Sequence, residues 1–293
     1  AETKLALSDV LRHTGQFDQA AVLGNEALAL RRSLGGDNDP ETGECLSNLS
    51  KLARDRGDFE EAERTLAMAM AVWEARYGPE HPRLVDGLND KAWLQFRRGE
   101  MQGAEETLDR SVRIGRSMLG EHHPDVGNAI YEWGVVKEAR GDAAGAEAKL
   151  REALGIYRAS LGDANPSVWS TLDALAQLLI QSRRDYAGAE PLAREAMEGR
   201  RALFGAHAGE TALSMGTVAR ILSGAGRKEE AEAMFKEAIA ALSVAYGPEH
   251  SYVAIAMNNL GVLLQERGDW AGAEAAFSEA LRINRKSLGP QHI

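Results

Sequence analysis

The chain has 293 residues, 27% of them charged, and a formal net charge of −10 at pH 7. An acidic surface repels phosphate groups, so this composition argues against binding to nucleic acid or to a membrane surface. The single cysteine, Cys45, excludes an intramolecular disulfide, and no membrane-spanning apolar run or signal-peptide pattern occurs, so we expect a cytoplasmic protein.

One alanine-containing motif returns along the whole sequence with a period of 42 residues. The period has one step of 43, near Arg183 and Arg184, and the alanines are Ala20, Ala62, Ala104, Ala146, Ala189, Ala231 and Ala273. Such a period is typical of stacked repeats that share one continuous core. It predicts one repeat domain over residues 1–293, with units near 1–36, 37–78, 79–120, 121–162, 163–205, 206–247 and 248–293. The chain starts without Met and stops within a unit, so we expect a fragment of a longer protein.

Each unit predicts two helices that are separated by turns. The first helix begins at a proline, which is favoured in the first turn, in four units: Pro40, Pro82, Pro124 and Pro166. Glycines that favour a left-handed backbone end the first helices at Gly15, Gly57, Gly99, Gly141, Gly226 and Gly268. The fifth unit has Arg184 or Asp185 at this place. The second helices end at Gly36, Gly78, Gly120, Gly162, Gly205, Gly247 and Gly289.

Small residues occupy one fixed position in every first helix: Ser8, Ser50, Ala92, Gly134, Ala176, Ala219 and Gly261. A second row of small residues occurs in the second helices: Ala27, Ala69, Ser111, Ala153, Ala196, Ala238 and Ala280. Rows of this kind predict seams where two helices touch closely. We therefore expect Gly134→Leu to destabilise the fold by about 1–3 kcal/mol or more through overpacking.

The repeated motif, with a glycine, an aromatic or large residue and an alanine, resembles the tetratricopeptide repeat. The 42-residue period and the connector Gly78-Pro79-Glu80-His81-Pro82 resemble the kinesin light chain class of these repeats. The resemblance implies an all-α fold, a right-handed solenoid of about seven antiparallel helix pairs. It also implies that the first helices line a concave groove that binds peptides, where paired asparagines hold the peptide backbone.

The groove positions give the candidate binding residues. The asparagine pair is complete at Asn258 and Asn259, while the matching positions elsewhere include Asn48 and Asn89. One turn further on, the first helices carry Lys51, Trp93 and Arg220, and the next turn carries Phe96. If these rows face the groove, Trp93, Phe96 and Tyr131 form an aromatic patch that is suited to anchor a partner. Packing of the same rings between repeats is the alternative.

Neither a metal site nor a catalytic site is indicated. His81, His123 and His250 fall in equivalent connectors, about 10 Å apart for packed helices, which is too far for one zinc ion. We expect these histidines to cap helices or to take part in the turns. The sequence has no H-E-x-x-H, G-x-S-x-G, P-loop or C-x-x-C motif. We therefore expect no enzymatic activity and no cofactor, and we interpret Cys45 as a structural thiol.

These observations favour a scaffold that binds a peptide or a partner protein in the concave groove. The alternative is a regulatory or sensor segment of a larger bacterial signalling enzyme, such as a kinase, a caspase-like protease or an NTPase. A third hypothesis is a homo-oligomer formed through the terminal repeats, because neither end has an obvious polar cap. We expect the last second helix to expose Trp270, Ala276, Phe277 and Ile283.

Overall fold

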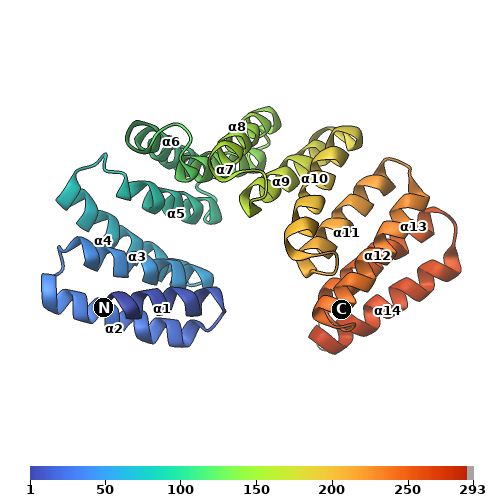
Figure 1. Cartoon of the computed structure of the whole chain (residues 1–293), viewed down its shortest axis with the longest axis horizontal. Helices are drawn as coiled ribbons and strands as arrows, with labels where there is room; N and C mark the ends of the chain where they lie inside the picture. The colour runs from blue at the N-terminus through green and yellow to red at the C-terminus, as the bar shows by residue number, and fades with distance from the viewer. Residues whose placement is uncertain (289–293) are drawn as a thin grey trace. The chain divides into compact units, whose positions relative to one another are not determined.

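The computed structural model describes residues 1–288, and this range contains fourteen helices and no strand (Figure 1). The first helices of the pairs are α1 (Glu2–His13), α3 (Pro40–Asp55), α5 (Arg83–Arg97), α7 (Pro124–Ala139), α9 (Pro166–Arg183), α11 (Gly209–Gly224) and α13 (Ser251–Glu266). The second helices are α2 (Phe17–Gly35), α4 (Phe59–Tyr77), α6 (Met101–Leu119), α8 (Ala143–Leu161), α10 (Tyr186–Phe204), α12 (Lys228–Tyr246) and α14 (Trp270–Leu288). The predicted all-α fold of seven helix pairs is confirmed.

The helices form two compact units, Ala1–Ile156 and Tyr157–Ile293, which we call unit 1 and unit 2. Within unit 1, α3 packs on α4 and α5 on α6, and the first helices α1 and α3 and then α5 and α7 also touch. Within unit 2, the pairs α9–α10, α11–α12 and α13–α14 pack in the same way. The organisation of residues 1–293 as one domain stays a prediction.

Side-chain caps explain where several first helices begin. Asp39 accepts a hydrogen bond from the backbone N–H of Glu41 at the start of α3, and Asn165 accepts one from Ser167 at the start of α9. The three connector histidines do the same through Nδ1: His81, His123 and His250 accept from backbone N–H groups two residues later, at 3.2–3.3 Å. His123 and His250 are the N-caps of α7 and α13, as predicted. The N-cap of α5 is Pro82, so His81 makes its contact from the turn before the helix. The α5 helix begins at Arg83, one residue after the predicted Pro82.

The predicted helix ends are confirmed by the backbone. Every predicted turn glycine from Gly15 to Gly268 has a positive φ, between 75° and 100°. Gly289 lies outside the described residues. In the fifth unit, Arg184 takes the left-handed conformation with φ 51°, the one non-glycine residue to do so within residues 1–288. An arginine there carries a steric cost that glycine avoids.

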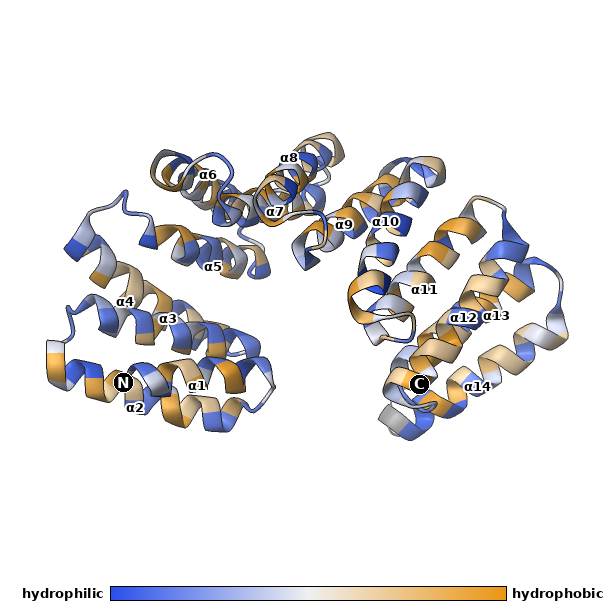
Figure 2. Cartoon of the chain, in the orientation of Figure 1, coloured by the Kyte–Doolittle hydropathy of each residue, from blue (hydrophilic) through white to orange (hydrophobic). Residues whose placement is uncertain are grey.

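The two rows of small residues lie where helices of one pair meet. In unit 1, Ser8 and Ser50 are buried, and their hydroxyls donate to the carbonyl oxygens of Ala20 and Ala62, at 2.8 and 2.7 Å. Helices that approach this closely leave no room for a large side chain between them. Hydrophobic and hydrophilic residues alternate along the helices (Figure 2), as is typical of helices that bury one face.

Ion pairs connect successive second helices on the outside of the core. Arginines near the carboxyl ends of α6, α8 and α10 contact glutamates of the following second helix: Arg116–Glu152, Arg158–Glu195 and Arg201–Glu237. Each pair lies within one unit. The three arginines and the three glutamates occupy equivalent positions of their repeats, so the contact recurs with the period of the sequence.

The predicted exposed face of α14 is partly wrong. Trp270 is 68% exposed, as expected, but Ile283 is fully buried in a cluster with Leu242 and Val253. Phe277 packs against the core of unit 2, where its ring lies against Gly261. The α13 helix covers these side chains, because glycine and small residues on α13 leave room for them. Among residues 1–288, no helix is long and apolar enough to cross a membrane.

Candidate functional site

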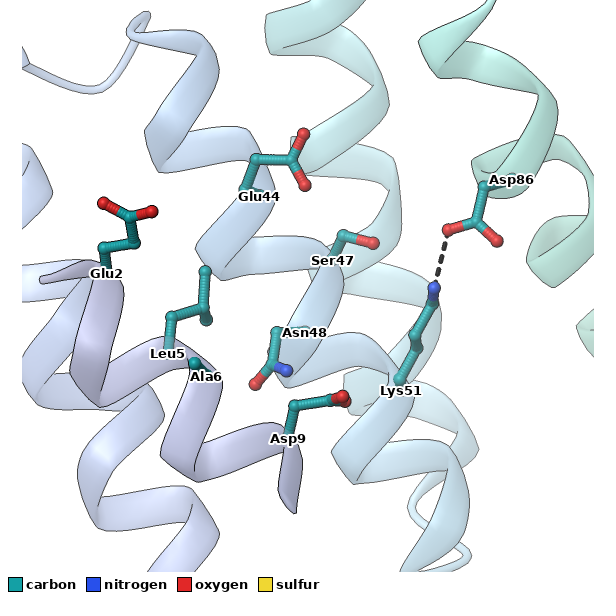
Figure 3. Close-up of a pocket in the computed structure, with 9 residues that line it drawn as sticks. All are labelled: Glu2, Leu5, Ala6, Asp9, Glu44, Ser47, Asn48, Lys51 and Asp86. Atoms are coloured by element: carbon teal, nitrogen blue, oxygen red, sulfur yellow. Dashed lines mark hydrogen bonds and ion pairs between the residues drawn. The ribbon is translucent and has the colours of Figure 1, made fainter. Parts of the chain in front are cut away.

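A cavity of about 310 Å³ lies between the first helices α1, α3 and α5 of unit 1 (Figure 3). We call it the α3 cavity. Its lining residues come from these three helices only: Glu2, Leu5, Ala6, Asp9, Glu44, Ser47, Asn48, Lys51 and Asp86. The lining therefore combines four carboxylates, one ammonium group and two polar side chains with a small apolar floor.

Ser47 and Asn48 bring unused hydrogen-bonding groups to the α3 cavity. Asn48 Oδ1 accepts a hydrogen bond from Ser8 Oγ at 3.0 Å, while its side-chain NH₂ has no partner among the described residues. Ser47 is only 5% exposed, and its hydroxyl also makes no hydrogen bond within unit 1. These two groups are therefore available to a ligand.

Lys51 is held by two carboxylates of α5. Its Nζ lies 2.6 Å from Asp86 and 3.7 Å from Asp90. Burial alone would lower the pKa of Lys51, but the charges of Asp86 and Asp90 outweigh it, so the pKa is raised and the side chain stays cationic. The ion pairs fix the ammonium group on the α5 side of the α3 cavity.

Asp90 forms the deepest part of this charge network. Its Oδ1 accepts from Arg54 Nη1 at 2.5 Å, but its buried Oδ2 has no hydrogen-bond partner within unit 1. Burial, together with the neighbouring Asp86, raises the pKa of Asp90. Glu132 occupies the equivalent position on α7, and burial and the charge of Asp90 raise its pKa to about 7. Carboxylates therefore recur along the first-helix face of unit 1, next to Lys51 and Arg54.

The structure separates the predicted binding residues of unit 1 into two groups. Asn48 and Lys51 line the α3 cavity. Asn89 lies in the core, only 8% exposed: its Oδ1 accepts from Ser111 Oγ at 2.6 Å, and its NH₂ donates to the carbonyl oxygen of Asp125 at 3.4 Å. Its amide is therefore committed to packing between α5, α6 and α7.

The three predicted aromatic anchors are all half-buried. Trp93 packs against the core of unit 1, with its ring 5.8 Å from that of Phe59, and the guanidinium groups of Arg54 and Arg97 lie over it at 5.5 and 5.6 Å. This is the packing alternative for Trp93. Phe96 on α5 and Tyr131 on α7 are half-buried as well, and their role in binding stays a prediction.

The predicted residues of unit 2 lie on a less charged surface. Arg220 on α11 and Asn258 on α13 are exposed, and Asn259 is half-buried. Around them, Ile255 is 56% and Val262 is 43% exposed. This face of unit 2 differs chemically from the charged face of unit 1.

Sequence reasoning missed the acidic row of the α3 cavity. Glu2, Glu44 and Asp86 stand 42 residues apart, at one equivalent position of three successive units. The signal is present in this spacing, but acidic residues are common at helix surfaces, so the spacing alone does not indicate a site. Among residues 1–288, no group of His, Cys, Asp or Glu side chains is arranged to hold a metal ion.

Comparison with known proteins agrees with the architecture. The family model of the tetratricopeptide repeat matches residues 1–72, 52–117, 168–243 and 230–286. No curated protein sequence matches the chain.

Three solved structures illustrate the likeness, and at these low identities each shows the fold alone. A kinesin light chain from Podospora anserina with nearly identical TPR-like repeats has 20% identity and a TM-score of 0.63, over 73% of this chain and 100% of that chain. A signal transduction ATPase with a tetratricopeptide repeat sensor, from Pyrococcus horikoshii, has 16% identity and a TM-score of 0.74, over 97% of this chain and 42% of that chain. A Rap protein complexed with competence and sporulation factor has 15% identity and a TM-score of 0.63, over 97% and 76%.

The family model covers more than half of the sequence, and the helix pairs, the turn glycines and the seams of small residues recur with its repeat. The chain belongs to the tetratricopeptide repeat family.

Proposed function

We propose that this protein is a non-catalytic scaffold that binds a peptide segment of a partner protein on the first-helix face of unit 1. The observation that carries the proposal is the α3 cavity, where the NH₂ group of Asn48 and the hydroxyl of Ser47 are unpaired. A peptide backbone offers the carbonyl and N–H groups that such side chains bind. Apolar contact with Leu5 and Ala6 would add to the affinity.

The other predicted residues enter this proposal with separate roles. Lys51 partly neutralises the negative charge of the α3 cavity. Phe96 and Tyr131 extend the same face along α5 and α7. Arg220, Asn258 and Asn259 form a second proposed contact region on unit 2, for a more apolar segment of the partner. Trp93 supports the site through packing. We also propose a cytoplasmic location and no binding of nucleic acid, consistent with the net charge of −10.

Peptide display tests this function without assuming a sequence for the ligand. A random peptide library would be selected on the whole chain, and enriched peptides would be measured on the Ser47→Ala/Asn48→Ala variant. Loss of hydrogen bonds of this kind weakens binding by about tenfold. Asn38→Ala, at an exposed turn outside the cavity, is the matched control. Enriched peptides that bind both variants equally would place the binding site elsewhere.

The second candidate is a regulatory or sensor segment of a larger signalling enzyme. It is favoured by the likeness to a signal transduction ATPase, of which this chain covers 42%. The sequence of the full-length gene would decide between the two: a neighbouring nucleotide-binding or protease domain would support the sensor. A complete reading frame that holds tetratricopeptide repeats alone would contradict it.

A further inference from the structure

We infer that the peptide bound at the α3 cavity is cationic and carries an arginine or lysine at every third position. This inference rests on the proposed function and names the chemistry of the ligand. Its basis is the charge of the lining, the hydrogen-bonding groups that are left open, and the spacing of one carboxylate row.

The lining of the α3 cavity has more negative than positive groups. Glu2, Asp9, Glu44 and Asp86 face it against the single ammonium of Lys51. That ammonium is bound to Asp86 and is 25% exposed, whereas the side chains of Glu44 and Asp86 are 38% and 59% exposed. The carboxylates are therefore accessible to a ligand, and the lysine is less so. An acidic peptide would meet repulsion here.

Arginines near the cavity leave part of this charge uncompensated. Arg12 pairs with Asp9 at 2.8 Å and with Asp55 at 2.6 Å, and Arg83 pairs with Glu44. Each carboxylate has two oxygens and can accept several hydrogen bonds, so one partner does not saturate it. Glu2 has no ion-pair partner among the described residues. A guanidinium group of a ligand is suited to these sites because it donates in a planar fork.

The unpaired hydroxyl of Ser47 provides an observation that is independent of the charges. Ser47 lines the cavity while 95% of its surface is covered, since its exposed fraction is 5%, and its Oγ has no partner in unit 1. Figure 3 shows Ser47 between Glu44 and Lys51 on α3, with Asp86 across from it on α5. A donor from the ligand would pair with this hydroxyl and with Glu44 or Asp86 at the same time.

The spacing of the carboxylates sets the register of the ligand. Glu2, Glu44 and Asp86 hold equivalent positions on the successive first helices α1, α3 and α5, and packed helices lie about 8–10 Å apart in general. A polyproline II chain rises about 3.1 Å per residue and has three residues per turn. Residues three apart in such a chain therefore point to the same side, about 9 Å from one another. Basic side chains at that interval would each meet one carboxylate of the row.

Fluorescence anisotropy with designed peptides tests this inference. The probe is a peptide of three Arg-Pro-Ala triplets, which favour polyproline II, and the comparison peptides carry Gln or Glu in place of Arg. We expect the arginine peptide to bind about tenfold more tightly than the glutamine peptide, and its affinity to fall as salt is added. Equal or tighter binding of the glutamine or glutamate peptide would overturn the inference.

Variants of the whole chain locate the effect. Glu44→Gln should weaken binding of the arginine peptide several-fold and leave the affinity for the glutamine peptide unchanged. Glu60→Gln, which removes the same charge from the exposed start of α4, is the matched control. Lys51→Met should change affinity in the opposite direction, because it removes a competing cation. Circular dichroism would confirm that the variants are folded. An arginine peptide that is insensitive to Glu44→Gln would contradict the assignment.

The two proposals fail in different ways. Peptides from the random library that depend on Asn48 but carry no basic residues would leave the scaffold function standing and overturn the cationic ligand. Absence of binding by all three designed peptides up to about 1 mM would also overturn the cationic ligand. If substitution of Ser47 and Asn48 does not change the affinity for the library peptides, the assignment of the α3 cavity as the binding site would be wrong.

Discussion

Replacement of Gly134 tests how closely the two helices of a repeat approach. A Cβ atom added at Gly134 on α7 would lie 2.9 Å from Cγ and 3.0 Å from Cδ2 of Leu150 on α8. Leu150 is fully buried, so it has little room to move. Gly134→Leu adds three more carbon atoms at this contact, and we expect it to destabilise unit 1 by about 1–3 kcal/mol or more.

The size of the new side chain should control the effect. Ala92 and Ala176 occupy the equivalent position in other repeats, so Gly134→Ala requires only a small shift and should be close to neutral. Gly155→Leu on α8 is the matched control, because a Cβ there meets no atom within 4 Å. Leucine replaces a poor helix former in both variants, so the control should be neutral or stabilised by up to about 1 kcal/mol.

Thermal unfolding followed by circular dichroism measures the difference. For a cooperative unit of this size, each kcal/mol shifts the melting temperature by about 2–4 °C. We expect Gly134→Leu to melt several degrees below the control. Equal melting temperatures for Gly134→Leu and Gly155→Leu would refute the close contact and remove Gly134 from the packed seam.

Three further predictions follow from buried or strained groups. The pKa of Glu132 is raised from 4.5 to about 7, so the folded state binds its proton more tightly and stability falls as the pH rises between these values. Glu132→Gln should therefore stabilise the protein at pH 8, by at most about 3 kcal/mol, with no gain near pH 4 in urea unfolding. Arg184→Gly should raise stability by up to about 1 kcal/mol by relieving the positive φ, whereas Arg184→Val should lower it; equal stabilities would contradict the strain. Cys45 is 1% exposed, and burial raises the pKa of its thiol, so Ellman's reagent should react with it only on unfolding; fast reaction of the folded protein would contradict this burial.

The fold could be predicted from the sequence because its motifs repeat. Proline, histidine and glycine act through local backbone chemistry, and their spacing repeats, so the helix ends at Gly57 or Gly99 could be predicted residue by residue. Even the exception at Arg184 was visible, because the period lengthens by one residue beside it. Local chemistry of this kind does not depend on the neighbouring repeats.

The binding residues were harder to predict, because position on a helix does not determine which partner a side chain finds. Ser47 and Asn89 hold equivalent positions on α3 and α5, yet Ser47 lines a cavity and the amide of Asn89 is bound inside the core. The difference comes from Ser111, whose hydroxyl donates to Asn89 Oδ1. The other repeats have alanine at the position of Ser111, so this one polar exception was the signal that Asn89 has an internal partner.

The same ion pair joins three successive pairs of second helices: Arg116–Glu152, Arg158–Glu195 and Arg201–Glu237. Neighbouring repeats in this part of the chain are therefore joined by interchangeable contacts. If the unit that contains α8 were removed, Arg116 would face Glu195, the glutamate that Arg158 contacts in the present chain. Duplication of a unit would add one more arginine and one more glutamate at the same positions. Gain or loss of one unit between α6 and α12 is therefore compatible with the same ion pair at the new junction. A gene that encodes such a chain can therefore gain or lose whole units in this region while the helices at the new boundary still form an arginine–glutamate pair.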